Sequence, residues 1–349
     1  MRILPNLNFL RFFLAMAVLV FHVPQMSKNM GLAAFNSFPI FNKGTEAVNV
    51  FFALSGFLII RKLWIEKDKG MISIKKFYMR RILRIIPLYL LIVVFGFLYY
   101  RVFLELVGIP FENNYSFIEA ILLFLFFLPN IAAVDLRPGG ILEILWSIGI
   151  EEQFYLLIAP VFGVLKKHKI MLFLSVFTVL YFILFHNLGI LSKYKFLYFY
   201  FSFGGLIGIL SEKRLIKLNK TGKFILAILF IIYFFSNWFY ILPTPYYNAI
   251  SVFLFGFFIL SISEEPIFMI NNKLINYFGK ISYGIYVYHP LAMHLMIFLF
   301  LKLSAKFSIP NYIIIISVNF FVITLTILIA HFSYKYYELY FLKLKNKFR

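Results

Sequence analysis

The feature that most constrains this chain is a succession of apolar runs, each about as long as a lipid bilayer is thick. Eleven such runs follow one another with short loops between them. A helix needs about 20 mainly apolar residues to cross the hydrocarbon core. Only 14% of the residues are charged, whereas a soluble domain averages about 25%. The sequence therefore predicts an all-α membrane helix bundle, formed as a single domain by residues 1–349. The runs are 5–24, 45–61, 85–104, 117–134, 145–165, 170–187, 196–211, 224–241, 247–263, 281–301 and 311–333.

The net charge of +20 is large enough to suggest a nucleic-acid binder. In membrane proteins, however, Lys and Arg gather in cytoplasmic loops and set the orientation of the chain. The basic residues here form four clusters between or after apolar runs, which fits the second explanation. We therefore expect no nucleic-acid partner, and we place all four clusters in the cytoplasm beside membrane lipid. Their members are Arg61, Lys62, Lys67, Lys69, Lys75, Lys76, Arg80, Arg81 and Arg84; Lys166, Lys167 and Lys169; Lys213, Arg214, Lys217, Lys220 and Lys223; and Lys335, Lys343, Lys345, Lys347 and Arg349.

The same clusters indicate which apolar run does not cross the membrane. Run 85–104 leaves the cytoplasm and run 145–165 must return to it, so 117–134 has both ends outside. The simplest solution is that 117–134 is re-entrant or interfacial, which is allowed only where protein buries its backbone. About ten crossings then remain, with both termini in the cytoplasm.

Two polar residues stand on the first run. Arg11 and His22 lie within roughly 20° of one helix face and about 16 Å apart along the axis. An imidazole is the side chain best suited to take a proton from a hydroxyl near neutral pH. The other explanation is a snorkelling arginine and an interfacial histidine bonded to a neighbour. Spacing alone favours that second explanation.

A small pair, Ser55-Gly56, interrupts the aromatic second run. Small residues usually let two membrane helices pack closely. The same pair could equally let a thin substrate approach the backbone. Packing is the more common reason for such a pair.

Basic and apolar residues alternate over 72–84, which is typical of an interfacial amphipathic helix. Arg80 and Arg81 stand four and three residues before Arg84, so each is its neighbour on the helix surface. Guanidinium groups at a cytoplasmic helix start are suited to binding phosphate. The alternative is that they only orient the chain and contact anionic lipid.

Glu151 and Glu152 lie inside the run 145–165. A charge in lipid costs several kcal/mol unless it is paired, so intramembrane carboxylates mark functional or structural polar sites. We expect one of them to pair with an arginine or to orient His22. Adjacent helical residues point about 100° apart, so the two need not share a role.

The sequence predicts no metal site. The chain has no cysteine, which excludes thiolate ligands, disulfides and a cysteine nucleophile. His289 and His294 are five residues apart and diverge by about 140° on a helix, which makes them a poor pair of metal ligands.

Taken together, five motifs resemble those of the acyltransferase type-3 family of membrane O-acyltransferases, in order and over nearly the whole chain. Arg11 with His22 is similar to the family's Arg-x10-His pattern, and residues 48–59 to its V-D-x-F-F-x-L-S-G-F-L-I. Residues 80–87, 146–155 and 281–290 resemble R-R-x-x-R-I-x-P, W-S-L-x-x-E-E-Q-F-Y and S-Y-G-I-Y-x-x-H. Two positions depart: Asn49 stands where Asp is usual, which puts a charge-dependent role there in doubt, and Ile148 replaces Leu.

The resemblance implies about ten spans. The charge clusters indicate the same number independently. It also implies transfer of an acyl group, commonly acetyl, from cytoplasmic acyl-CoA to a hydroxyl of a cell-surface or secreted glycan, free or lipid-linked. The setting would be a bacterial inner membrane. Many relatives carry an additional C-terminal soluble domain, which we do not expect here, since the chain ends at Arg349. By that resemblance His22 and Arg11 are expected to be the catalytic residues, and Arg81 and Arg84 to contact the donor's phosphates. To these we add, as our own expectation, Glu151 and Glu152 for catalysis, Arg80 for the donor's phosphates, and Ser55, Trp146, Tyr286 and His289 for substrate contacts.

Two other functions stay open. Buried Arg, Glu and His also line substrate paths, so the chain could be a transporter or flippase of a lipid-linked glycan or organic anion. Transporters often contain paired broken helices from internal repeats, and we find no second copy of 117–134. A scaffold protein would tolerate changes at all of these sites.

Overall fold

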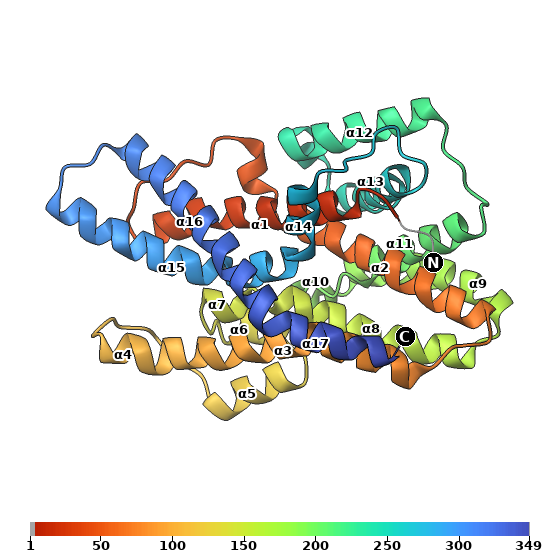
Figure 1. The fold of residues 1–349 in the computed structure, drawn as a ribbon, viewed down its shortest axis with the longest axis horizontal. Coiled ribbons are helices and arrows are strands. Elements are labelled where there is room, and N and C mark those ends of the chain that lie inside the picture. The colour runs from red at the N-terminus through yellow and green to blue at the C-terminus, as the bar shows by residue number, and fades with distance from the viewer. Residues whose placement is uncertain (1–3, 349) are drawn as a thin grey trace.

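A computed structural model describes residues 4–348, and Arg349 of the basic tail lies outside them together with residues 1–3. The described residues form helices and no strands (Figure 1). The ten helices of 15 residues or more are α1 (Leu7–Asn29), α2 (Gly44–Asp68), α3 (Ile74–Leu98), α8 (Trp146–Val164), α9 (Lys167–Asn187), α11 (Tyr198–Glu212), α12 (Lys220–Phe235), α13 (Thr244–Ser263), α15 (Ser282–Lys306) and α16 (Asn311–Ser333). The shorter ones are α4 (Leu104–Leu106), α5 (Phe117–Leu125), α6 (Pro129–Asp135), α7 (Gly140–Glu143), α10 (Gly189–Lys193), α14 (Lys273–Lys280) and α17 (Leu339–Leu344). Single 3-10 turns occupy Pro39–Asn42, Trp238–Ile241 and Lys345–Phe348, and π-helical turns continue α3 over Tyr99–Phe103 and α16 over Tyr334–Glu338.

The predicted all-helical membrane bundle is confirmed. Within residues 4–348, seven helical runs are long and apolar enough to cross a bilayer. Of the remaining long helices, α8 carries Glu151, Glu152 and Gln153, while α11 and α12 have only 15 and 16 residues. The count of ten crossings therefore stays a prediction. The seven runs are Leu7–Asn29, Gly44–Asp68, Ile74–Leu106, Lys167–Asn187, Thr244–Ser263, Ser282–Lys306 and Asn311–Phe348.

The segment 117–134 is broken into α5 and α6, of nine and seven residues. At 1.5 Å per residue, neither helix reaches half of a hydrocarbon core of about 30 Å. The break between them holds Phe127 with a positive φ of 58°. Its carbonyl accepts a hydrogen bond of 2.5 Å from Nε2 of Gln153 on α8. Protein thus satisfies the broken backbone, as a segment that enters but does not cross the membrane requires.

Close packing of α2 against α11 explains Gly56, the second residue of the small pair Ser55-Gly56. A methyl group on Gly56 would come within 2.0 Å of the Phe201 carbonyl oxygen, and one on Gly204 within 2.1 Å of the Ala53 oxygen. The two backbones approach so closely that only glycine fits at these positions. Gly56 therefore serves helix packing, which leaves Ser55 free to face another direction.

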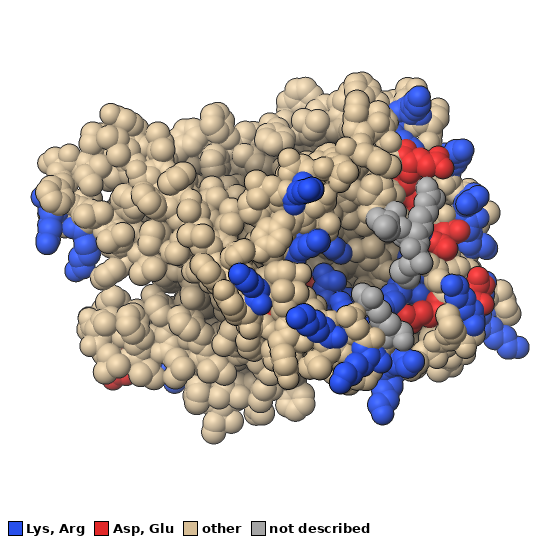
Figure 2. Space-filling view, in the orientation of Figure 1, with Lys and Arg blue, Asp and Glu red and all other residues tan. Residues whose placement is uncertain are grey.

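The four basic clusters meet at one end of the bundle. Arg61 on α2 pairs with Glu212 at the end of α11, with 2.5 Å between Nη2 and Oε2. Lys167 at the start of α9 pairs with Asp68 at the end of α2. In the space-filling view most blue side chains gather at this end, on the right, near both termini (Figure 2). A concentration of basic residues at one end of a membrane bundle is the pattern that the positive-inside rule describes.

Candidate functional site

Two cavities in the described part of the bundle are bordered by residues that the sequence singled out, and the smaller one is basic. We call it the inner cavity, because it opens among the clusters at the basic end. Its volume is about 400 Å³, and its walls come from α1, α2, α3, α8 and α15. Six of the residues that the sequence singled out border it: Arg11, Ser55, Arg81, Arg84, Glu151 and Tyr286.

The inner cavity carries an excess of positive charge. Among the described residues that line it, five are basic and Glu151 is the one acid. Acids outside the cavity partly offset two of the five: Glu212 and Glu264 lie 2.5 and 3.7 Å from Arg61, and Glu66 lies 3.6 Å from Lys62. Guanidinium groups in excess over carboxylates, shielded from water, bind phosphate oxygens strongly. The five basic residues are Arg11, Arg61, Lys62, Arg81 and Arg84.

Glu151 is held in one orientation by two hydroxyl groups. Its Oε1 accepts hydrogen bonds from Ser55 Oγ and from the Tyr155 hydroxyl. These two hydroxyl oxygens are themselves 2.9 Å apart. The guanidinium carbon of Arg81 lies 5.8 Å from the centre of the Tyr155 ring. Ser55 thus fixes a carboxylate beside the arginines of the inner cavity, a role that its sequence context alone did not reveal.

Arg80 faces away from the inner cavity, unlike Arg81 and Arg84. Its Nη2 lies 2.8 and 2.9 Å from the two carboxylate oxygens of Glu66 on α2. Its Nη1 donates to the Phe348 carbonyl at 3.0 Å. The side chain is buried and already paired, so it joins α3 to α2 and to the C-terminal segment. Of the three arginines expected to hold phosphate, only two border the cavity.

The larger outer cavity lies toward the opposite end and has a volume of about 1310 Å³. Residues of α1, α3, α6, α7 and α15 line it, together with the turns that extend α3. His22 and Trp146, both expected at the site, border this cavity rather than the inner one. The Nζ atom of Lys195 lies 4.5 Å above the Trp146 ring. Arg11 and His22 are thus on one helix but in different cavities.

His22 is paired with His289 of α15. Nδ1 of His289 lies 2.5 Å from the Tyr286 carbonyl oxygen, which can only accept, so this nitrogen carries the proton of the neutral imidazole. Nε2 of His289 is then an acceptor, 3.1 Å from Nδ1 of His22. Nδ1 of His22 also lies 3.0 Å from the Val18 carbonyl oxygen, and two acceptors place its proton there. Nε2 of His22 is left with its lone pair.

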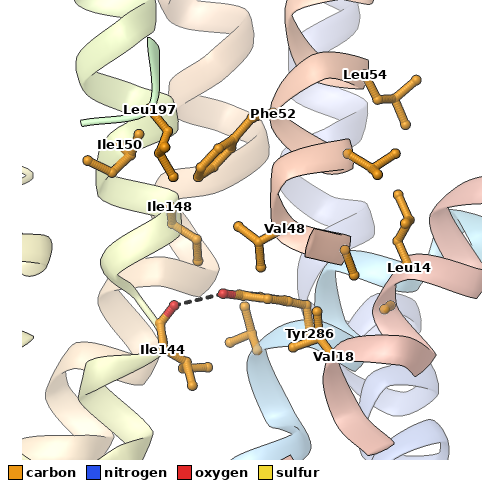
Figure 3. Packing of buried hydrophobic residues seen from close by; sticks show 14 of the residues in the cluster. Leu14, Val18, Val48, Phe52, Leu54, Ile144, Ile148, Ile150, Leu197 and Tyr286 are labelled. Carbon is orange, nitrogen blue, oxygen red and sulfur yellow. Dashed lines mark hydrogen bonds between the residues drawn. The ribbon is translucent and has the colours of Figure 1, made fainter. Parts of the chain in front are cut away.

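A thin apolar layer separates the two cavities. Figure 3 shows Val48, Ile148 and Tyr286 pointing toward one another from α2, α8 and α15, next to Val18 of α1. The Tyr286 hydroxyl donates to the Ile144 carbonyl at 2.9 Å and lies 2.6 Å from Ser147 Oγ. Ile144 borders the outer cavity, while Tyr286 borders the inner one. The cavities are therefore one layer of side chains apart.

Glu152 and His289 border neither cavity. Glu152 is buried, and its Oε1 has no hydrogen-bond partner among the described residues. The next residue, Gln153, turns toward α6 and α11, where it donates to Asn130 Oδ1 at 2.9 Å and accepts from the Tyr198 hydroxyl at 2.7 Å. The three residues thus face three directions, as the helical rotation of about 100° per residue predicts.

Several residues of the two cavities were not singled out by the sequence. Arg61 and Lys62 look like ordinary members of a basic loop cluster, and Lys195 lies in a loop between α10 and α11. No local pattern marks them, because their position depends on which helices pack together. Asn49, where the resembling motif has Asp, lies 3.5 Å from the Tyr200 hydroxyl and borders neither cavity.

Comparison with known proteins supplies a family. The family described as "Acyltransferase domain" matches residues 4–332. The chain is 28% identical over 275 residues to "Putative acetyltransferase ORF330" of Acidianus two-tailed virus, which covers 74% of this chain and 76% of the relative. It is 23% identical over 386 aligned positions to "Putative O-acetyltransferase SACOL0978" of Staphylococcus aureus (strain COL), over 98% of this chain and 58% of the relative.

A third relative is similar to this chain over a shorter stretch. No solved structure matches the chain. "Acyltransferase MdmB" of Streptomyces mycarofaciens is 38% identical over 91 residues, which are 25% of this chain and 21% of the relative. The chain spans little more than half the length of the staphylococcal relative that it matches along nearly all of its own.

Proposed function

The chain belongs to the acyltransferase domain family that matches residues 4–332, and from this premise we propose that it is an acyl-CoA-dependent membrane O-acyltransferase. It moves an acyl group, commonly acetyl, to a hydroxyl group of a cell-surface or secreted glycan. The observation that carries the proposal is the pairing of a phosphate-suited inner cavity with an unprotonated His22 nitrogen one layer of side chains away.

The donor binds in the inner cavity. Coenzyme A carries several phosphate charges, and the arginine-rich wall offers fixed guanidinium donors for them. Arg81 and Arg84 make these contacts, whereas Arg80 holds α3 against Glu66 instead. Arg11 stands on the helix that also carries His22. Its charge holds the donor at the side of the cavity from which the thioester must advance.

His22 acts as the general base. Its Nε2 accepts the proton of the acceptor hydroxyl, and the hydroxyl oxygen attacks the thioester carbonyl carbon. The C–O ester bond forms, the C–S bond breaks, and the proton passes from His22 to the departing sulfur to give free coenzyme A thiol. His289 accepts from Nδ1–H of His22 and so keeps the second nitrogen basic. His289 is thus a positioning residue, not a substrate contact.

The thioester has to cross the apolar layer between the cavities. Arg11 and His22 are separated by about 16 Å along α1. The extended arm of coenzyme A can span such a distance if the side chains around Tyr286 move apart. The hydrogen bonds of Tyr286 to Ile144 and Ser147 close this layer at rest. An acyl group can then leave the cytoplasmic side without a water-filled pore.

The orientation of the chain follows from the same scheme. Both termini and the inner cavity face the cytoplasm, where acyl-CoA is available, and the outer cavity faces the opposite side of a bacterial inner membrane. The gathering of basic residues at the inner end supports this orientation.

The experiment that tests the proposal uses purified protein in lipid nanodiscs with radiolabelled acetyl-CoA and glycan-containing extract of the native host. An acyltransferase releases coenzyme A thiol in step with labelled acceptor. A transporter or flippase consumes no acetyl-CoA, and that outcome would overturn the proposal.

A further inference from the structure

One cation faces the outer cavity, in which His22 would act as the base. Lys195 is the only Lys or Arg among the described residues that border this cavity, and Glu143 is the only acid among them. Lys195 lies in the loop between α10 and α11. Its ammonium group acts electrostatically on His22. A positive charge therefore stands in the space where the proposed transfer takes place.

Lys195 stands beside the apolar layer that separates the cavities. Its Nζ atom lies 4.5 Å from the centre of the Trp146 ring. Trp146 begins α8 and precedes Ser147, whose Oγ lies 2.6 Å from the Tyr286 hydroxyl in that layer. A thioester that passes the layer would therefore reach the outer cavity next to the ammonium group.

The contact with Trp146 leaves this ammonium group free to donate hydrogen bonds. The face of an indole ring attracts a cation without neutralising it. Among the described residues, no carboxylate forms an ion pair with Lys195. Lys193, two residues earlier, is paired instead with Asp135, with 2.8 Å between Nζ and Oδ1. Lys195 thus keeps its charge and its N–H groups for the cavity.

The other donors of the outer cavity are engaged or uncharged. The side-chain nitrogen of Asn130 donates to a backbone carbonyl at 2.9 Å. The Tyr100 hydroxyl faces Nε2 of His294 at 3.4 Å. Gln25 and Asn29 border the cavity further along α1, and their amide groups carry no charge. The ammonium group is therefore the strongest hydrogen-bond donor that the described walls offer to a negative oxygen.

The backbone at Lys195 also indicates that its side chain has a role. Helix α10 ends in a Schellman turn, in which the Lys195 N–H donates to the Ser192 carbonyl at 3.1 Å and the Phe196 N–H to the Leu191 carbonyl at 3.0 Å. Lys195 has a φ of 56° and occupies the position of this turn where glycine is usual. Of the six non-glycine residues with positive φ in the described part of the chain, only Lys195 borders either cavity.

We propose that Lys195 stabilises the negative charge that forms on the thioester carbonyl oxygen during acyl transfer. As the acceptor oxygen bonds to the carbonyl carbon, the π electrons of the C=O bond move onto its oxygen, while His22 holds the acceptor's proton. An N–H group of Lys195 donates a hydrogen bond to that oxygen and keeps its own proton. The C=O bond then re-forms, the C–S electrons leave with the sulfur, and the sulfur takes the proton from His22.

This inference rests on the proposed function and adds a second catalytic residue to it. A base removes the proton of the acceptor but does nothing for the charge on the carbonyl oxygen. Donors that are fixed in advance around such an oxygen usually contribute about 100–1,000-fold to kcat. Trp146 and the Schellman turn fix Lys195 in this way. Because the charge exists only after the C–O bond begins to form, Lys195 should affect kcat and not KM.

A matched pair of glycine variants tests the role. Lys195→Gly removes the ammonium group and places the usual residue at this position of the turn, so the fold should keep its thermal stability. The control is Arg214→Gly. Arg214 is also a basic residue with a positive φ, 55°, in a Schellman turn at the end of α11, and it borders neither cavity.

Both variants are purified in nanodiscs and assayed with radiolabelled acetyl-CoA and glycan-containing extract of the native host. Lys195→Gly should lower kcat by about 100–1,000-fold. The half-saturating amounts of acetyl-CoA and of extract should stay within about threefold. Arg214→Gly should behave as the unmodified protein.

Chemical restoration of the ammonium group separates its charge from its packing. The chain has no cysteine, so Lys195→Cys provides a single thiol. Alkylation of this thiol with 2-bromoethylamine gives a side chain of nearly the length of lysine that ends in an ammonium group, whereas iodoacetamide gives a neutral one. The first form should exceed the second in kcat by about tenfold or more. Equal activity of the two forms would show that the charge has no role and would overturn the inference.

The remaining outcomes distinguish this inference from the proposed function. If the unmodified protein transfers acetyl and Lys195→Gly keeps kcat within about threefold, the inference fails and the proposed function stands. If more extract restores the activity of Lys195→Gly, the residue binds the acceptor instead, and the inference also fails. If the unmodified protein releases no coenzyme A thiol, the proposed function fails and takes this inference with it.

Discussion

Nδ1 of His22 and Nε2 of His289 lie 3.1 Å apart, with their rings stacked at a centroid distance of 5.1 Å. This contact joins α1 to α15 across 267 residues of sequence. It also sets the protonation of both rings, because the Tyr286 carbonyl oxygen at the far end can only accept. A series of hydrogen bonds, which begins at Tyr286 in the layer between the two cavities, thus sets which nitrogen of His22 is basic.

This series of hydrogen bonds predicts distinct effects for two substitutions at position 289. His289→Leu removes the acceptor for Nδ1–H of His22 and should lower kcat by about 10–100-fold, the usual effect of losing a group that orients a functional histidine. His289→Gln offers Oε1 as a replacement acceptor and should recover part of the loss. The KM for acyl-CoA should not change in either, because the donor binds in the other cavity. If the two variants are expressed equally and lose equal activity, His289 only packs against its neighbours and does not orient His22.

Arg84, which borders the inner cavity, and Arg80, which is paired with Glu66, should differ in their effect on donor binding. Arg84→Gln should raise the KM for acyl-CoA by about 10–100-fold, the value of a lost charge-assisted hydrogen bond. Arg80→Gln should leave that KM within about threefold, but should lower thermal stability, since it leaves Glu66 without its buried partner. Steady-state kinetics and unfolding in detergent measure the pair. If Arg80→Gln weakens donor binding as much as Arg84→Gln, the assignment of the inner cavity is wrong.

Adjacent carboxylates should respond differently to the same substitution. Glu151→Gln removes the negative charge held by Ser55 and Tyr155 among the arginines, and should reduce transfer by about tenfold or more. Glu152→Gln replaces a buried carboxylate oxygen without a partner by a neutral amide, which costs less to bury. Transfer should stay within about threefold. A Glu152→Gln variant as impaired as Glu151→Gln would refute the separation of roles.

The apolar layer predicts a block that spares donor binding. Val48→Phe adds bulk where α2, α8 and α15 meet around Tyr286, and should reduce transfer by about tenfold or more because the thioester can no longer pass. Coenzyme A binding, measured by calorimetry in nanodiscs, should persist. The control is Val94→Phe, an exposed residue on α3 that borders neither cavity and should behave as the unmodified protein. Because Val48 also borders the inner cavity, loss of coenzyme A binding in Val48→Phe would contradict the separation of donor binding from passage through the layer.

Sequence reasoning reached the helical class and singled out many of the residues that border the two cavities, for identifiable reasons. Apolar runs report directly on the solvent around a helix, so the bundle was predictable. The basic clusters singled out the segment 117–134, which the structure divides into α5 and α6. Arg11 and His22 share a face because the helical repeat is regular. Yet the sequence could not show that Arg11 and His22 border different cavities. That separation depends on the side chains of α2, α8 and α15 meeting between them.

The same limit explains why Arg80 and His289 lie elsewhere than the sequence led us to expect. Arg80, Arg81 and Arg84 are equivalent on a helical wheel until α2 places Glu66 beside the first of them. His289 appears as one more substrate contact until α15 packs against α1 and places it behind His22. Pairing across the bundle is a tertiary property, and no local pattern encodes it.

The measurement that bears most directly on the account is acetyl transfer by His22→Ala. Purified variant and unmodified protein are compared in nanodiscs for coenzyme A binding, for thiol release from acetyl-CoA, and for labelled acceptor. We predict that the variant binds coenzyme A with unchanged affinity but loses transfer by about 100-fold or more, the contribution of a general base. Transfer that persists in His22→Ala would contradict the central claim that this imidazole takes the proton of the acceptor.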